Sequence, residues 1–271
     1  MLRSTCEFGS DKENIPPCLD YKLQRVPLSK IIATQYGKQI ETQLRLVEKE
    51  FSTEDCLASH RITEEHRCKM VDWMCEVLHV FGCSSRTFFL SVRIMDVYFK
   101  LQARTIGLEE LHVIGVACMF IASKYEDVKP LKLKIIYHKI VNQKLTKSYI
   151  RAVEREILEA IQYRISIPTV LDFLEKAIES YPRQVKQTAV LIAELCQVSY
   201  EISALSPYVL ATTIHKLTQC TFSFSSYSDQ LVETLKEFLM TYKWTHHKYV
   251  AVLLKHNAKL QPAPGKWFTF M

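Results

Sequence analysis

The chain has 271 residues, of which 48% are hydrophobic, and its 35 basic and 29 acidic residues give a formal net charge of +6. This length and composition suffice for a buried core, and the mild charge excess favours acidic protein surfaces over nucleic acid as a partner. The uncharged apolar run 113–122 covers only about half the length that a membrane-spanning helix needs, so we expect no membrane partner.

The amino-terminal stretch, residues 1–28, contains the charged run Asp11–Asn14 and the pair Pro16-Pro17 but little apolar periodicity. Segments that cannot bury apolar surface stay unfolded, so we expect a disordered leader. In the next segment, 29–52, apolar residues recur at helical spacing from Ile31 to Val47. This pattern predicts one amphipathic N-terminal helix over about Leu28–Phe51.

Five helices are expected in the segment 53–165. The most informative of them is the third, which is apolar on nearly every face from Leu111 to Ala122 and ends at Lys124. A helix without a polar side must be wrapped by other helices, and a cation at its carboxyl end is favoured by the helix dipole. The predicted helices are Thr63–Phe81, Ser85–Leu101, Leu108–Tyr125, Leu131–Val141 and Thr146–Ile161.

A second set of five helices is expected in the segment 166–260, followed by a tail at 261–271. Val71-Asp72-Trp73-Met74 and Leu171-Asp172-Phe173-Leu174 lie about one repeat length apart, which indicates a domain copy. The chain's six glycines are a low count that suits helices. We therefore expect an all-α fold of two tandem five-helix bundles preceded by the N-terminal helix. The second set comprises Thr169–Ser180, Gln184–Glu201, Pro207–Leu217, Ser228–Thr241 and Lys248–Asn257.

Catalytic and metal-binding motifs are missing from the sequence. It has no Gly-rich phosphate loop, no Gly-x-Ser-x-Gly and no His-Glu-x-x-His, so we expect neither an enzyme nor a cofactor. Cys68, Cys75 and His79 can share a helix face, but a structural zinc site is tetrahedral and closed. We expect these cysteines to pack in the core, with no metal. Nine cysteines without a CxxC pair favour a reducing compartment.

Five segments of the chain together form a recognisable pattern. They are Arg67–Val77, Ile94–Phe99 with Asp96, Ala122–Asp127, Arg151–Glu154 and Pro168–Leu174. In this order they resemble the cyclin box, and in detail they are most similar to mitotic cyclins of the A/B type. The resemblance covers roughly residues 35–260 and implies the tandem cyclin-box fold. It also implies a nuclear and cytoplasmic regulatory subunit that binds and activates a cyclin-dependent kinase at G2/M.

The resemblance also assigns roles to individual residues. It implies that Arg67 and Asp96 form an internal ion pair, and that Lys124 and Glu154 present hydrogen bonds to the kinase. The alternative for each, taken alone, is a solvated charge or a helix-end charge. The whole implied kinase-binding surface consists of Ile121, Lys124, Tyr125, Glu154, Tyr163 and Ile165.

A second implied surface is a docking groove on the first box helix, which in mitotic cyclins receives Arg-x-Leu peptides of substrates and inhibitors. Met70, Trp73 and Glu76 match it, although Trp73 is also compatible with a core position. The chain departs from the family at three positions, and the added cation disfavours a basic ligand, so we expect a groove that is weak, altered or absent. These positions are His66 for Met, Lys69 for Ile and His112 for Gln.

The leader contains two short degradation signals by resemblance. One is Lys12-Glu13-Asn14, and the other is Arg25-Val26-Pro27-Leu28, which resembles a destruction box although Ala33 replaces its usual terminal Asn. They imply the anaphase ubiquitin ligase as a further partner, the alternative being an ordinary charged tail.

One function of a different class stays open at this point. A transcription-initiation factor with tandem cyclin folds would bind DNA and polymerase, and lysines are dense over 129–144. Such factors normally carry an amino-terminal zinc ribbon, whereas the leader here has only Cys6 and Cys18. The regulatory-subunit interpretation therefore leads.

Overall fold

The computed structural model describes residues 28–223 and 229–241, and the chain divides into two units, 1–40 and 41–271. Within the first unit, the described part is the beginning of helix α1 (Leu28–Glu50), so Leu28 is the first residue of a helix. The expected leader up to residue 27, the helix expected at Lys248–Asn257 and the tail 261–271 lie outside the described residues.

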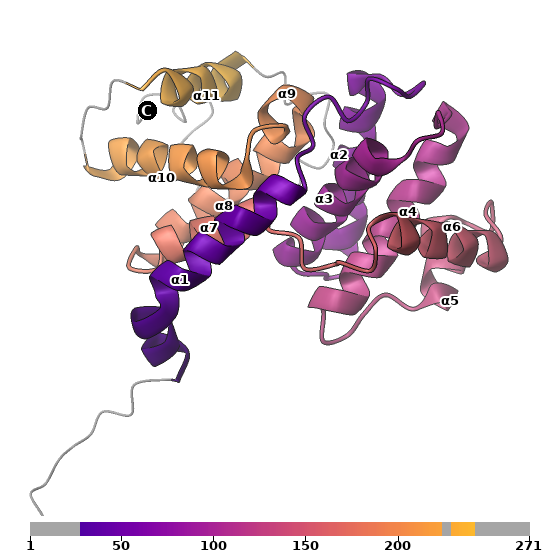
Figure 1. Cartoon of the computed structure of the whole chain (residues 1–271), viewed down its shortest axis with the longest axis horizontal. Coiled ribbons are helices and arrows are strands. Elements are labelled where there is room, and N and C mark those ends of the chain that lie inside the picture. Colours follow the sequence, from indigo (N-terminus) through magenta and orange to yellow (C-terminus); the bar gives the residue numbers. More distant parts are fainter. Residues whose placement is uncertain (1–27, 224–228, 242–271) are drawn as a thin grey trace, which may run out of the picture. The chain divides into compact units, whose positions relative to one another are not determined.

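The described residues are helical, and their connections contain no strand, so the expected all-α fold is confirmed (Figure 1). Among the described residues, most of the helices expected after residue 53 begin and end within three residues of their predicted bounds. Two are interrupted, and the helix expected at Pro207–Leu217 continues to Ser223. In chain order the helices are α2 (Glu64–Val80), α3 (Ser85–Leu101), α4 (Leu108–Glu126), α5 (Leu133–Ile135), the π-helix η1 (Ile136–Ile140), α6 (Lys147–Ala160), α7 (Val170–Ala177), α8 (Arg183–Val198), α9 (Tyr200–Ser203), α10 (Pro207–Ser223) and α11 (Gln230–Thr241).

The first interruption is in the helix expected at Leu131–Val141, which is a short α-turn followed by the π-helix η1. The N–H of Val141 donates to the carbonyl of Ile136 at 2.9 Å, a bond that spans five residues. Two residues in the left-handed region, Asn142 (φ 47°) and Gln143 (φ 63°), then end the helix. Left-handed backbone is unfavourable for residues other than glycine and cannot continue a helix.

The second interruption splits the helix expected at Gln184–Glu201 into α8 and α9. Ser199 between them is extended (φ −72°, ψ 126°), and its side chain accepts a hydrogen bond from the N–H of Ile202 at 3.3 Å. Serine caps a helix by this bond and therefore competes with helix continuation. Sequence periodicity carries no sign of this break, because the apolar residues on both sides keep helical spacing.

Helix α4 lies at the centre of the first bundle and packs against α2, α3 and α6 (Figure 1). Its residues from Val113 to Ser123 are all buried, which confirms that no side of the helix faces solvent over this stretch. Gly115 lets α2 approach closely, since a Cβ atom there would lie 1.9 Å from Cε of Met70. The core of the second bundle is centred on α10, which packs against α7, α8 and α11.

Candidate functional site

The ion pair that the resemblance implies between Arg67 of α2 and Asp96 of α3 is present, and both residues are buried. The Arg67 guanidinium donates to both carboxylate oxygens of Asp96, from Nε at 2.8 Å and from Nη2 at 2.6 Å, and Arg67 has an exposed fraction of 0%. Burial by itself lowers the pKa of Arg67, but the charge and hydrogen bonds of Asp96 outweigh it and raise that pKa. A two-pronged pair of this kind is among the strongest polar contacts in proteins.

The same guanidinium reaches the second bundle, which sequence reasoning missed. Its remaining nitrogen, Nη1, donates to the backbone carbonyl of Gln197 at 3.0 Å, in the last turn of α8. The carbonyls of a last helical turn have no partner within their own helix, so an arginine is a natural donor there. No pattern in the sequence signals this contact, because its acceptor is a backbone atom.

Lys124 and Glu154 come together where the carboxyl end of α4 meets α6. Nζ of Lys124 donates to Oε1 of Glu154, and it also lies 4.1 Å from the centre of the Phe120 ring. The side chain of Lys124 is 41% exposed and that of Glu154 is 13% exposed. The two residues thus form a preassembled pair at the surface, which the resemblance did not imply.

The resemblance assigns two tyrosines and an isoleucine to the same surface as this pair. Tyr125 follows Lys124 and is 51% exposed, while Tyr163, just after α6, is 63% exposed. The turn that places Tyr163 has two left-handed residues, Gln162 (φ 53°) and Tyr163 itself (φ 58°). The N–H of Tyr163 donates to the carbonyl of Leu158 at 2.8 Å and closes the helix end. Ile165 packs partly against the core.

One expected member of the kinase-binding surface is corrected. Ile121 is 2% exposed and belongs to the core, because it lies in the stretch 113–123 of α4, where every residue is buried. Sequence reasoning also missed Val128, which is 99% exposed in the loop after α4. A single apolar residue between Asp127 and Lys129 was the available signal. We call Lys124, Tyr125, Val128, Glu154, Tyr163 and Ile165 the clamp surface.

The expected docking groove is also assembled, between α2 and the beginning of α4. It has a volume of about 330 Å³ and contains Trp73, which packs partly against the core as well. Glu76 is exposed and does not line the groove. The lining consists of His66, Lys69, Met70, Trp73, Leu108, Leu111 and His112, of which the two leucines were not expected.

The three departures from the family pattern have different surroundings. The ammonium of Lys69 lies 2.6 Å from Glu65, and both side chains are largely exposed. His66 completes the amino-terminal cap of α2, where its Nδ1 lies 3.0 Å from the hydroxyl of Thr63. The His112 ring lies 4.9 Å from the Trp73 ring, and burial, with a contribution from Lys144, lowers its pKa. His112 therefore adds little positive charge at neutral pH.

The described residues offer no cluster of three or more His, Cys, Asp or Glu side chains that could hold a metal ion. Cys75 is buried and Cys68 is partly buried. No helix of the described part is both long and apolar enough to cross a membrane. The candidate site thus consists of two surfaces suited to binding, the clamp surface and the docking groove.

Comparisons with known proteins identify the family and the fold of the chain. Residues 38–166 match the family model "Cyclin, N-terminal domain", and residues 168–264 match "Cyclin, C-terminal domain". The chain is 29% identical over 191 residues to "G2/mitotic-specific cyclin-B1" of Oryzias latipes, an alignment that covers 69% of this chain and 46% of that protein. It is 28% identical over 211 residues to "G2/mitotic-specific cyclin S13-6" of Glycine max, covering 77% and 45%.

The chain spans about half the length of the curated relatives that it matches. Among solved structures, a viral cyclin from herpesvirus saimiri is similar with a TM-score of 0.59 and 19% sequence identity, covering 84% of this chain and 98% of that chain. At this identity the likeness concerns the fold.

Proposed function

Because the chain belongs to the cyclin family, we propose that it is the regulatory subunit of a cyclin-dependent kinase and acts in cell division at G2/M. Members of this family are regulators rather than catalysts, and the relatives named above carry mitotic names. The observation that carries the proposal is the preassembled Lys124–Glu154 pair, whose lysine is exposed next to the exposed Tyr125.

The proposed mechanism is a population shift in the kinase. An isolated cyclin-dependent kinase keeps its mobile helix, with a glutamate on it, away from the lysine that binds ATP. Active kinases need that lysine–glutamate ion pair in place. The clamp surface would bind the inward position of the helix better than the outward one and so favour it. Moving an equilibrium from 1:99 to 99:1 requires about 5.5 kcal/mol of differential binding.

The chemistry of the clamp surface suits this task. Tyr125, Val128 and Tyr163 offer apolar area that is exposed in the free chain. Lys124 and Glu154 can redirect their hydrogen bonds to a partner, because an ion pair near solvent is weak and easily exchanged. Once a kinase covers the pair and removes water, loss of either charge costs about 2–5 kcal/mol.

The docking groove is proposed to select substrates and inhibitors differently from ordinary mitotic cyclins. The support is its preserved apolar floor, formed by Met70, Trp73 and Leu111, together with the added cation Lys69. We further propose that the leader directs degradation by the anaphase ubiquitin ligase and that the protein works in nucleus and cytoplasm. A DNA-binding initiation factor stays the alternative if no kinase is found.

The test is co-purification of a kinase from dividing cells, with the bound kinase identified by mass spectrometry and assayed on histone. The double substitution Lys124→Ala/Glu154→Ala should abolish kinase binding and activation while the helical circular-dichroism signal stays at the wild-type level. A matched control is Lys236→Ala/Glu233→Ala, which removes another ion pair (2.7 Å) on α11, away from the clamp surface. The control should activate the kinase normally.

Two results would argue against the proposal. If the Lys124/Glu154 variant activates its kinase as well as the wild type, the clamp surface is not the kinase contact. If the intact protein binds no kinase but shifts DNA in a mobility assay, the initiation-factor alternative takes its place.

A further inference from the structure

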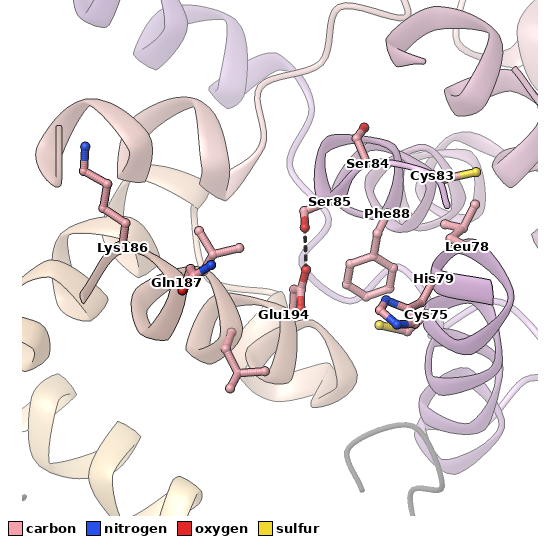
Figure 2. A pocket seen from close by; sticks show the side chains of 12 residues that line it. Cys75, Leu78, His79, Cys83, Ser84, Ser85, Phe88, Lys186, Gln187 and Glu194 are labelled. Carbon is pink, nitrogen blue, oxygen red and sulfur yellow. Dashed lines mark hydrogen bonds between the residues drawn. The ribbon is translucent and has the colours of Figure 1, made fainter. Parts of the chain in front are cut away.

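A second cleft lies apart from the clamp surface and the docking groove, where α2 and the beginning of α3 face α8 (Figure 2). Its volume is about 350 Å³, within the range of sites that bind small ligands or side chains. Apolar side chains form part of its wall, and one carboxyl group, Glu194, lines it as well. The apolar members are Leu78, Phe88, Val190 and Leu191.

Glu194 is buried, with an exposed fraction of 9%. One carboxylate oxygen, Oε1, accepts a hydrogen bond from the hydroxyl of Ser85 at 2.7 Å, across the cleft (Figure 2). The other oxygen, Oε2, accepts none from the residues that the structure describes. Burial raises the pKa of Glu194 to about 7, against the opposing effect of the Ser85 hydrogen bond. A buried carboxylate with a free oxygen is unfavourable until a donor reaches it.

The basic side chains that line this cleft do not supply that donor. Lys186 lines the same cleft, but its ammonium donates to the carbonyl of Glu179 at 2.5 Å. Figure 2 shows Lys186 directed away from the Ser85–Glu194 hydrogen bond, at the far end of the cleft. His79 lines the cleft from α2, and Figure 2 shows its ring beside Cys75. The carboxyl group of Glu194 therefore lines the cleft without an ion-pair partner among the described residues.

We propose that this cleft is a docking site for an arginine or lysine side chain, flanked by an apolar residue, in a segment of a partner protein. The cation would donate to Oε2 of Glu194, and a hydrogen bond between two charged groups is about twice as strong as a neutral one. Its aliphatic stem and the apolar neighbour would pack on Leu78, Phe88 and Leu191, because long basic side chains bury their stems along apolar surface.

The test compares two fluorescein-labelled peptides by anisotropy, Gly-Ser-Leu-Arg-Leu-Ser-Gly and the same peptide with citrulline in place of arginine. Citrulline keeps the shape and removes the charge. The wild-type chain should bind the arginine peptide about tenfold or more tightly than the citrulline peptide. Glu194→Gln should reduce this ratio to about one, since the amide keeps an oxygen for Ser85 but carries no charge.

Two further experiments, one with a variant and one with a crosslinking peptide, locate the site at which the peptide binds. Lys186→Met removes a repelling cation from the cleft and should strengthen arginine-peptide binding, an effect opposite in sign to that of Glu194→Gln. A benzoylphenylalanine analogue of the peptide should crosslink to the tryptic fragment 187–216, which contains Glu194, or to the fragment 87–93, which contains Phe88. Neither fragment contributes to the docking groove.

Three outcomes would overturn the proposal. One is equal affinity of the wild-type chain for the arginine and citrulline peptides, a comparison that needs no variant to fold. Another is crosslinking confined to the docking groove around Trp73. The third is binding of butylguanidine alone as tightly as the arginine peptide, which would make the cleft a small-molecule site instead.

Discussion

The guanidinium of Arg67 caps the carboxyl end of α8 through the backbone carbonyl of Gln197, at 3.0 Å, while its other nitrogens hold Asp96. One side chain of the first bundle thus forms an ion pair within that bundle and also donates a hydrogen bond to the last turn of a helix in the second bundle. A positive charge at a helix carboxyl end is also favoured by the helix dipole. The residue that locks α2 to α3 therefore also fixes α2 to α8.

Arg67→Ala should lower the free energy of unfolding by about 3–5 kcal/mol, because it leaves Asp96 charged and buried without a partner. Urea unfolding followed by circular dichroism measures this. The matched control is Lys69→Ala, on the same helix, whose pair with Glu65 is largely exposed. It should cost about 0–1 kcal/mol. Equal losses for the two variants would contradict the role given to burial.

The double substitution Arg67→Met/Asp96→Leu tests the cap separately. Replacing a buried ion pair by apolar side chains is often neutral or stabilising. This variant should therefore regain most of the free energy of unfolding that Arg67→Ala loses. It still leaves the Gln197 carbonyl without its donor, at a cost of about 1–3 kcal/mol. Amide hydrogen exchange should accordingly become faster at the α8–α9 junction around Ser199. Wild-type protection there would mean that the Arg67 cap contributes nothing.

Glu194→Gln should change how stability depends on pH. Because the folded-state pKa of Glu194 is raised from 4.5 to about 7, the native state holds more protons than the unfolded state between these values. The contribution of Glu194 to the free energy of unfolding is therefore fully present below pH 4.5. It is lost as the pH rises from 4.5 to about 7, by up to about 3 kcal/mol.

Urea unfolding at pH 5, 6, 7 and 8 tests this expectation. The variant should become more stable relative to the wild type with each step upward. The other titratable groups of the cleft, Cys75, His79, Cys83 and Lys186, are the same in both proteins, so the difference isolates Glu194. A constant gap between the two proteins over this range would contradict the burial of its carboxyl.

Lys69→Ile should strengthen binding of an Arg-x-Leu peptide about two- to fivefold, because it removes an exposed repelling charge and restores an apolar contact. Fluorescence anisotropy measures the affinity. His66→Met, the second change toward the family pattern, also removes the side chain that caps α2 with Thr63, so its effect has to be read beside a melting curve. If the unmodified chain binds the peptide as tightly as the variants, the charge of Lys69 does not weaken peptide binding in the groove.

Substitution of Lys12, Glu13 and Asn14 by alanine should lengthen the lifetime of the protein in cells that leave mitosis, since a ligase adaptor would lose its signal. Cycloheximide decay measured by immunoblot provides the lifetime. The second signal is tested with Arg25→Ala/Leu28→Ala in the same background. An unchanged decay curve with both signals removed would exclude regulated proteolysis through this leader.

The sequence by itself determined the helical fold, because its apolar residues repeat at helical spacing. This spacing is a local property that does not depend on how the helices pack. Its resemblance to the cyclin box also predicted that Arg67 pairs with Asp96 and that one groove is lined by His66, Lys69, Met70, Trp73 and His112. Glu76, assigned to the same groove, does not line it. These predictions concern side chains whose partners lie on neighbouring helices of one bundle.

Only the tertiary structure decided the rest. The burial of Ile121, the exposure of Val128, and the breaks at Ser199 and Asn142 depend on how helices cross and end, which periodicity does not encode. The cap on Gln197 joins residues 130 positions apart in the chain, through a backbone acceptor that every residue possesses. The cleft around Glu194 exists only because α8 packs beside α2 and α3, and that packing is what raises the pKa of its carboxyl.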